Sequence, residues 1–528
     1  MRRMLWSLVA GLAASSAAAV PHVRVAEGNL QGVDLPGLTP LSAYLGIPYA
    51  APPIGPLRWK PPRPAAHWRG IRLADRFGAR CMQQPLFADM MFRSPGPSED
   101  CLTLNVWTPG NAKRGSKLPV LFYIHGGGAI AGDGSERRYD GASLARQGIV
   151  VVTLNYRLGV FGFLATEELA AESPDHAAGN YGLLDQAAAL AWVRHNIVKF
   201  GGDPKRITIG GESAGSMSVS VLMTSPLTRT HFAQAIGESG GIFPPAFHPK
   251  SLAAAEQDGR AFSQAIGAMP LASMRAMPAD QLLEAQGRLK VSASFIVDGR
   301  FLTEPPIDSY AGGRSAHVPL LVGSNSQENG WSAILGDAPP TITNYRAGIA
   351  RLYGDRADAL FGLYPASTDA DVPAAATALA SDRFLAASTW KWFDMHRRTG
   401  QPTYYYYFTR IRPQAFPPIP NPTPSPSPTG ALHSAEIEYA LGNLDANPAY
   451  AWTADDYRIS KTMQGYFTAF IKTGDPNSPG LPRWSPAPTQ DGLIQRQTID
   501  TDTHSMPFTE HSRYEAALPL LDEPKAEP

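Results

Sequence analysis

The chain has only two cysteines, Cys81 and Cys101, among its 528 residues, and no excess of charge of either sign. Its 46 basic and 46 acidic side chains balance, which excludes a strong field that would attract nucleic acid or an anionic membrane. Charged residues make up 17% and apolar residues 44%, a composition that argues against disorder. No repeat or obvious linker divides the chain. We therefore expect one large core and a small-molecule partner. The sequence does not indicate an oligomeric state.

Long apolar runs are equally scarce, and the run near the start is short for a membrane-spanning helix. It follows two arginines and ends in small residues, with Ala17 and Ala19 in an A-x-A arrangement. This order is typical of a secretory signal peptide, with an uncleaved anchor as the alternative. We predict that residues 1–19 are removed and that residues 20–528 are exported, periplasmic or secreted, with no membrane span. In an exported chain, the two cysteines favour one disulfide over two free buried thiols.

Apolar runs rich in β-forming residues alternate with segments of helical periodicity, which predicts an α/β fold with a large, mostly parallel sheet flanked by helices. The runs cover residues 118–124, 148–156, 206–211, 233–239, 318–326 and 402–411. Ligands of parallel sheets bind beyond the carboxyl ends of the strands, so residues that follow these runs can meet in one site. Residues 413–428 carry eight prolines, which favours an extended surface loop over the alternative of a domain linker.

Two segments, residues 211–215 and 237–241, share the spacing Gly-x-Ser-x-Gly. A nucleophile elbow needs a strand before the serine and a helix after it. Ser213 has both, whereas glycines and prolines soon after Ser239 prevent an immediate helix. We predict that Ser213 is the nucleophile. Ser239 ends what we expect to be the adjacent strand, where it either hydrogen-bonds a catalytic side chain or is purely structural.

A serine nucleophile needs a base and an orienting acid, which follow it in the chain in the order acid, histidine when the serine lies on an elbow. Four histidines are late enough, and only His433 lies in a loop after a strand; the others are His396, His504 and His511. Glu328 follows a strong strand and Asp298 is its rival, and the residues alone leave this choice open.

Three glycines, residues 126–128, follow the first apolar strand of the expected sheet. Their unobstructed N–H groups, together with that of Ala214, can converge on a developing oxyanion. Arg137 and Arg138 follow shortly afterwards. They would favour acidic or polyester substrates if they faced the site entrance, but we expect solvated surface arginines here.

Ten stretches carry a family resemblance that covers nearly all of the mature chain. They are YLGIPYAAPPIGPLRWKPP (44–62), SEDCLTLNVWTP (98–109), YIHGGG (123–128), YDGASLA (139–145), VVVTLNYRLGVFGFL (150–164), GNYGLLDQAAALAWVRHNI (179–197), FGGDPKRITIGGESAG (200–215), GSNSQENG (323–330), ALHSAEIEYALG (431–442) and FIKTGDPNSP (470–479). With these the chain resembles the type-B carboxylesterase family, which includes the cholinesterases. The resemblance implies the α/β-hydrolase fold and hydrolysis of carboxylic esters without a metal or cofactor.

The same resemblance implies roles for individual residues, and it decides between Glu328 and Asp298. It implies that the catalytic triad is Ser213, Glu328 and His433 and that the oxyanion hole is Gly127, Gly128 and Ala214. It also implies a disulfide between Cys81 and Cys101, and a carboxylate beside the nucleophile, Glu212, that favours protonated His433. Two rival functions remain open, a non-catalytic binding or adhesion protein and an amidase or peptidase.

The sequence also departs from its family. The segment between Cys81 and Cys101 lacks the tryptophan with which cholinesterases face a quaternary ammonium, so we do not expect choline esters to be substrates. The further disulfides of eukaryotic members are missing, which favours a bacterial exported enzyme. The proline-rich loop before His433 is unusual for the family and leaves the shape of the pocket mouth undefined.

Overall fold

The computed structural model describes residues 21–522, apart from residues 38, 246, 268–269, 292, 417–427 and 491. The predicted signal peptide therefore lies outside the described residues, as does most of the proline-rich segment. Within the described part, no helix has both the length and the apolar character needed to cross a membrane.

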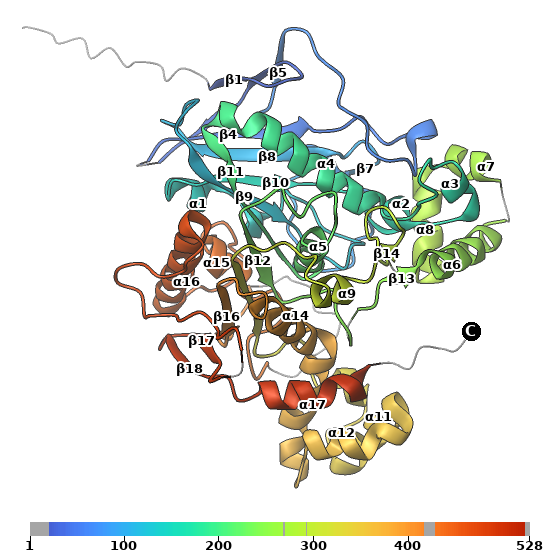
Figure 1. Ribbon diagram of the computed structural model, residues 1–528, viewed down its shortest axis with the longest axis vertical. Helices are drawn as coiled ribbons and strands as arrows, with labels where there is room; N and C mark the ends of the chain where they lie inside the picture. Colours follow the sequence, from blue (N-terminus) through green and yellow to red (C-terminus); the bar gives the residue numbers. More distant parts are fainter. Residues whose placement is uncertain are drawn as a thin grey trace, which may run out of the picture.

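Eleven strands of the described chain form one central sheet (Figure 1). In spatial order they are β18 (His504–Pro507), β17 (Gln495–Ile499), β16 (Thr403–Phe408), β15 (Leu320–Asn325), β12 (Gln234–Glu238), β11 (Gly202–Glu212), β9 (Leu118–Ile124), β10 (Val150–Leu154), β8 (Thr103–Pro109), β4 (Leu41–Pro48) and β3 (Val33–Leu35). The strands from β17 to β10 run parallel, which confirms the predicted sheet. Both edges are antiparallel, at β18 and from β8 to β3, where no crossover helix is needed.

The two faces of the sheet are buried by different helices, because alternate side chains of each strand point to opposite sides. On β9, Phe122 belongs to one core and Tyr123 to the other. The first face packs against α4 (Tyr181–Asn196), α5 (Ala214–Leu222) and α14 (Ala387–Arg397). The second packs against α1 (Ala142–Arg146), α15 (Ile437–Leu441) and α16 (Ala454–Thr473), which lie together in Figure 1. Helices on both faces confirm the α/β-hydrolase arrangement.

Further helices extend the domain beyond this sheet. A third core joins α2 (Gly159–Phe163), α3 (Glu167–Ala171), α6 (Leu252–Ala265), α7 (Leu271–Ala276) and α8 (Ala279–Leu289), next to the paired strands β13 (Lys250–Ser251) and β14 (Ile296–Val297). A second group contains α10 (Ser332–Leu335), α11 (Ile342–Tyr353), α12 (Ala357–Leu363), α13 (Val372–Ser381) and α17 (His511–Leu521), with α9 (Pro306–Ala311) closer to the sheet (Figure 1).

Short strands finish the amino-terminal part. A small sheet contains β1 (His22–Arg24), β2 (Asn29–Gln31) and β5 (Ile71–Leu73), and a second pairs β6 (Arg80–Cys81) with β7 (Pro97–Ser98). Cys81 and Cys101 form a disulfide beside this second pair, which confirms the predicted bridge.

Candidate active site

Ser213 occupies the sharp turn between β11 and α5, with a φ of 56° that residues other than glycine rarely adopt. The glycines on either side make the turn possible. A Cβ atom at Gly215 would lie 2.1 Å from the carbonyl oxygen of Ile124 on β9, and one at Gly211 would lie 2.6 Å from the same oxygen. The strand, turn and helix therefore form an elbow that presents the Ser213 hydroxyl to a cavity.

His433 and Glu328 meet this serine from two other strand ends. The Ser213 hydroxyl lies 3.0 Å from Nε2 of His433, and Nδ1 of the same ring lies 2.8 Å from Oε2 of Glu328. The other carboxylate oxygen of Glu328 accepts the backbone N–H of Asn325 at 2.6 Å. Since the carboxylate accepts from Nδ1–H, Nε2 is left free to accept the serine proton.

The loops that carry the acid and the base are hydrogen-bonded to each other. Gln327, next to Glu328, pairs as an isolated β-bridge with Leu432, next to His433. The side-chain oxygen of Gln327 also accepts the backbone N–H groups of Thr429 and Gly430, at 2.8 and 3.0 Å. The relative position of acid and base is thus set by backbone pairing as well as by their own contact.

The three residues that the resemblance assigns to the oxyanion hole all line the same cavity. Ala214 is the first residue of α5, so its N–H has no acceptor within the helix. Gly127 and Gly128 follow β9 with φ values of 101° and 64°, and both line the cavity together with Ala214. A Cβ atom at Gly127 would lie 2.3 Å from the carbonyl oxygen of Ala131, so this turn requires glycine. The arrangement suits a developing negative charge.

Glu212 is buried beside the nucleophile, with Oε1 3.2 Å from Nε2 of His433. Burial raises the pKa of Glu212 to about 8, although the nearby imidazole opposes this shift. Burial lowers the pKa of His433, but neighbouring carboxylates, Glu212 first and then Glu328, outweigh burial and leave that pKa above its ordinary value. A charged Glu212 therefore favours the protonated imidazole, as the family resemblance implied.

A buried polar network lies behind the triad, and sequence reasoning missed most of it. We left open whether Ser239 bonds a catalytic side chain or is purely structural; its hydroxyl donates to Glu436 at 3.1 Å and not to a residue of the triad. Glu436 also accepts the side-chain amide of Asn325, whose backbone supports Glu328. In the sequence, the only indication of this network was that Glu436 follows His433 by three residues, because the partners of Glu436 are distant in the chain.

The rejected residues of the sequence analysis have other partners. Asp298 accepts the backbone N–H groups of three residues that follow it, so it stabilises a turn. His396 is buried on α14 and its Nε2 lies 2.8 Å from the carbonyl oxygen of Val318. His504 and His511 lie in β18 and α17, close to carboxylates of the carboxyl-terminal region.

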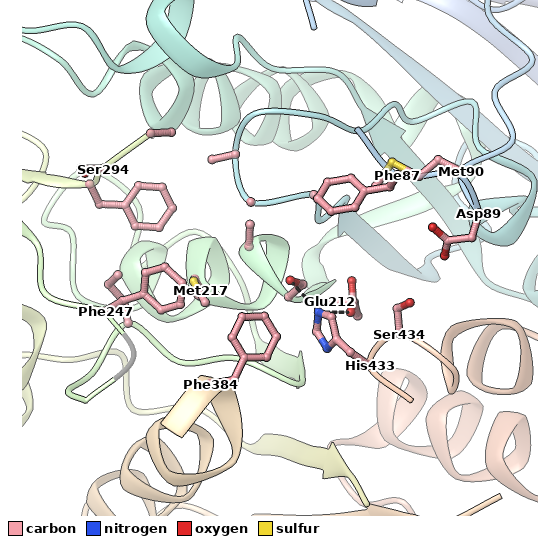
Figure 2. A pocket seen from close by; sticks show the side chains of 18 of the residues that line it. Phe87, Asp89, Met90, Glu212, Met217, Phe247, Ser294, Phe384, His433 and Ser434 are labelled. Carbon is pink, nitrogen blue, oxygen red and sulfur yellow. Dashed lines mark hydrogen bonds and ion pairs between the residues drawn. The ribbon is translucent and has the colours of Figure 1, made fainter. Parts of the chain in front are cut away.

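The cavity at Ser213 has a volume of about 400 Å³ and two chemically different sides. Figure 2 shows Met217, Phe247 and Ser294 on one side, away from His433. On the other side lie Asp89 and Ser434, next to the imidazole. Phe87 and Met90 also lie on the side of Asp89, so the side away from His433 is apolar apart from Ser294, whereas the side next to the imidazole is mixed.

Arg138 lines this cavity and is only 4% exposed, so our expectation of a solvated surface arginine was wrong for this residue. Its guanidinium pairs with Glu136 at 2.5 Å and with Asp89 at 3.0 Å. The sequence did not reveal that two carboxylates meet this arginine and neutralise its charge. Arg137 is exposed, as expected. The pairing leaves little free positive charge to favour acidic substrates.

Known proteins resemble this chain over nearly its whole length. The model of the carboxylesterase family matches residues 19–514. Fumonisin B1 esterase of Sphingopyxis macrogoltabida is 36% identical over 91% of this chain and 88% of its own, and a liver carboxylesterase of Sus scrofa is 32% identical over 91% and 90%. A solved structure of PNB esterase superposes with a TM-score of 0.77 and 30% identity, over 94% of this chain and 100% of the other. The chain therefore belongs to the carboxylesterase family and is a carboxylic ester hydrolase.

Proposed function

We propose that the protein hydrolyses carboxylic esters through an acyl-enzyme, with Ser213, His433 and Glu328 as its catalytic triad. The observation that carries this proposal is the continuous contact from the Ser213 hydroxyl through the imidazole to the Glu328 carboxylate. A serine hydroxyl is a weak nucleophile until a base removes its proton, and this contact supplies the base and orients it.

The geometry supports the following sequence of steps. Ser213 Oγ attacks the ester carbonyl while His433 Nε2 takes its proton, and the charged imidazole is stabilised by Glu328. The tetrahedral oxyanion accepts hydrogen bonds from the N–H groups of Gly127, Gly128 and Ala214. His433 then returns the proton to the leaving alcohol, which leaves an acyl group on Ser213. A water molecule, activated by the same imidazole, hydrolyses that ester and releases the carboxylic acid.

The site argues against one of the two rival functions, and an experiment separates the other from an esterase. A binding or adhesion protein has no need of a hydroxyl, base and acid in contact, yet this site keeps all three. An amidase or peptidase would use the same groups, so the comparison of rates on an ester and a matched anilide separates it from an esterase. We expect the ester to be hydrolysed much faster.

The test of the triad compares the two serines of the repeated Gly-x-Ser-x-Gly pattern. We expect Ser213→Ala to lose several orders of magnitude in kcat on a short-chain chromogenic ester and to resist labelling by an organophosphonate. Ser239→Ala is the matched control, because Ser239 donates to Glu436 and does not touch the imidazole; it should still be labelled at Ser213. Normal turnover or normal labelling of Ser213→Ala would refute the proposal.

We also propose that the protein is exported after removal of residues 1–19. The disulfide between Cys81 and Cys101 supports this, because disulfides persist in oxidising compartments. Amino-terminal sequencing of the protein from the periplasm or medium should begin near residue 20. Recovery from the cytoplasm alone, with its first residues intact, would contradict export.

A further inference from the structure

A second cavity of about 360 Å³ lies beside the catalytic cavity, between α2, α6 and the segment that joins α8 to β14. Its walls include the apolar side chains of Val160, Leu164, Phe262 and Ile296. Lys250 lies at the same cavity but already pairs with Asp258 on α6. The interior of this cavity therefore suits an apolar group better than a charged one.

The two cavities share one lining residue and are connected by two further contacts between their linings. Ser294 lines both of them. Beside it, the ring of Phe295 on the catalytic side lies 5.6 Å, centroid to centroid, from the ring of Phe163 on the other side. Farther along, Gly159 of the second cavity donates its N–H to the carbonyl oxygen of Ala129, which lines the first. The cavities are thus adjacent, and they meet at Ser294.

The position of His433 decides which part of an ester would extend toward Ser294. The leaving oxygen must lie near Nε2 of His433 to receive its proton, so the alcohol part lies on the imidazole side of the cavity. The acyl part then extends in the opposite direction. Figure 2 shows Met217, Phe247 and Ser294 on that opposite side.

Building on the acyl-enzyme mechanism proposed above, we propose that the second cavity receives the distal end of a long, unbranched acyl chain that passes Ser294. The substrate class is then esters of medium-chain and long-chain fatty acids. Each methylene that leaves water for an apolar wall makes binding more favourable, so a chain that fills both cavities binds better than one that ends at Ser294. Short acyl chains occupy the first cavity alone and are indifferent to the second.

The test narrows the second cavity without touching the triad. Ala261 lines this cavity on the exposed side of α6, and Ala255 lines it in the interior. Ala253, on the same helix, is exposed and is absent from the lining, so it provides a matched control. We would measure kcat/KM for p-nitrophenyl butyrate and dodecanoate, below their aggregation limits, in the wild type and in Ala261→Phe, Ala255→Phe and Ala253→Phe. Thermal unfolding reports whether each variant folds.

We expect the wild type to prefer dodecanoate, and Ala261→Phe and Ala255→Phe to lose roughly tenfold or more on dodecanoate while butyrate stays within about twofold. Ala253→Phe should match the wild type on both esters. Free dodecanoate should inhibit butyrate hydrolysis in the wild type and should do so more weakly in Ala261→Phe. Ala261 is exposed, so Ala261→Phe should fold and should keep the test valid if Ala255→Phe does not fold.

Two results would overturn the inference while leaving the proposed mechanism intact. The first is butyrate hydrolysis with no preference for dodecanoate in the wild type. The second is Ala261→Phe that hydrolyses dodecanoate and binds free dodecanoate like the wild type, or that loses both esters equally while folded. A wild type that hydrolyses neither ester, and is not labelled at Ser213, would instead contradict the proposed function itself.

Discussion

The Glu212 carboxylate lies beside His433, with Oε1 3.2 Å from Nε2 of the imidazole, and the two form an ion pair when the imidazole is protonated and the carboxylate is ionised. This carboxylate is the first of the charges that raise the pKa of His433 against the opposing effect of burial. The imidazole accepts the serine proton only when it is neutral, so a raised pKa moves the onset of activity to higher pH. The ion pair therefore favours transfer of the proton to His433 but reduces activity in mild acid.

Glu212→Gln should consequently shift the acidic limb of the kcat/KM profile to lower pH. Its maximal kcat should fall, because the charged imidazole of the transition state loses a nearby negative charge. The measurement is a pH–rate profile on a short-chain ester. Glu238→Gln is the control. Glu238 is also buried, but it accepts a hydrogen bond from Tyr123 and makes no hydrogen bond to His433. An unshifted profile in Glu212→Gln would show that this carboxylate does not govern the imidazole.

The choice of orienting acid leads to a second prediction. Glu328→Gln should lower kcat by roughly 10³–10⁴-fold, because a neutral amide neither stabilises the charged imidazole nor holds it in the required tautomer. Asp298→Asn, at the rival carboxylate, should keep kcat, since Asp298 binds backbone N–H groups of its own turn. Steady-state kinetics on both variants separate the two residues, and the reverse pattern would assign the role to Asp298.

The buried acid Glu238 predicts how stability depends on pH. Burial, followed by the neighbouring Glu436, raises its pKa well above the ordinary value. The folded protein thus holds a proton that the unfolded chain releases. The resulting stabilisation is complete below the unfolded pKa and is lost as the pH rises toward the folded pKa.

Glu238→Gln cannot ionise, so its free energy of unfolding should decline less with rising pH than that of the wild type. Denaturant titrations at a series of pH values measure this slope. Glu284→Gln is the matched control, because Glu284 is exposed on α8. Parallel curves for the wild type and Glu238→Gln would contradict the prediction.

Arg138 and Arg137 are neighbours in sequence, but their substitutions should differ greatly. Arg138→Ala leaves Glu136 buried without its partner, which should cost about 3–5 kcal/mol of stability. Burial raises the pKa of Glu136 to about 7 against the effect of Arg138, so protonation in mild acid should reduce that loss. Arg137→Ala should unfold like the wild type, since Arg137 is exposed. Denaturant unfolding of the two variants, above and below neutral pH, tests both statements.

Much of the fold and the nucleophile could be predicted because they depend on local patterns. The elbow at Ser213 requires glycines at fixed spacing, a strand before it and a helix after it, and all of these are neighbours in the chain. The parallel part of the sheet follows from the alternation of apolar runs and helical segments. The antiparallel edge from β8 to β4 did not follow, since β8 pairs with β4 and β10, which are distant from it in the chain and share no local pattern with it.

The supporting residues could not be predicted, because their roles depend on contacts between distant parts of the chain. Glu328 and Asp298 both follow strands, and only their surroundings in space distinguish them. Arg138 carries no sign of burial in its own segment, since one of its two carboxylate partners, Asp89, lies in the disulfide loop. The network of Ser239 and Glu436 joins residues almost two hundred positions apart.

The hydrogen bonds that join the loop of Glu328 to the loop of His433 affect how the protein tolerates changes in the length of its chain. The backbone N–H of Phe416 donates to the carbonyl oxygen of Ala449, and the backbone N–H of Gly430 donates to the side-chain oxygen of Gln327. His433 is therefore held next to Glu328 by contacts of Thr429, Gly430 and Leu432 with Gln327. We expect the triad to stay in contact when the length of chain between Phe416 and Thr429 is changed, so a reporter or a surface tether can be introduced there.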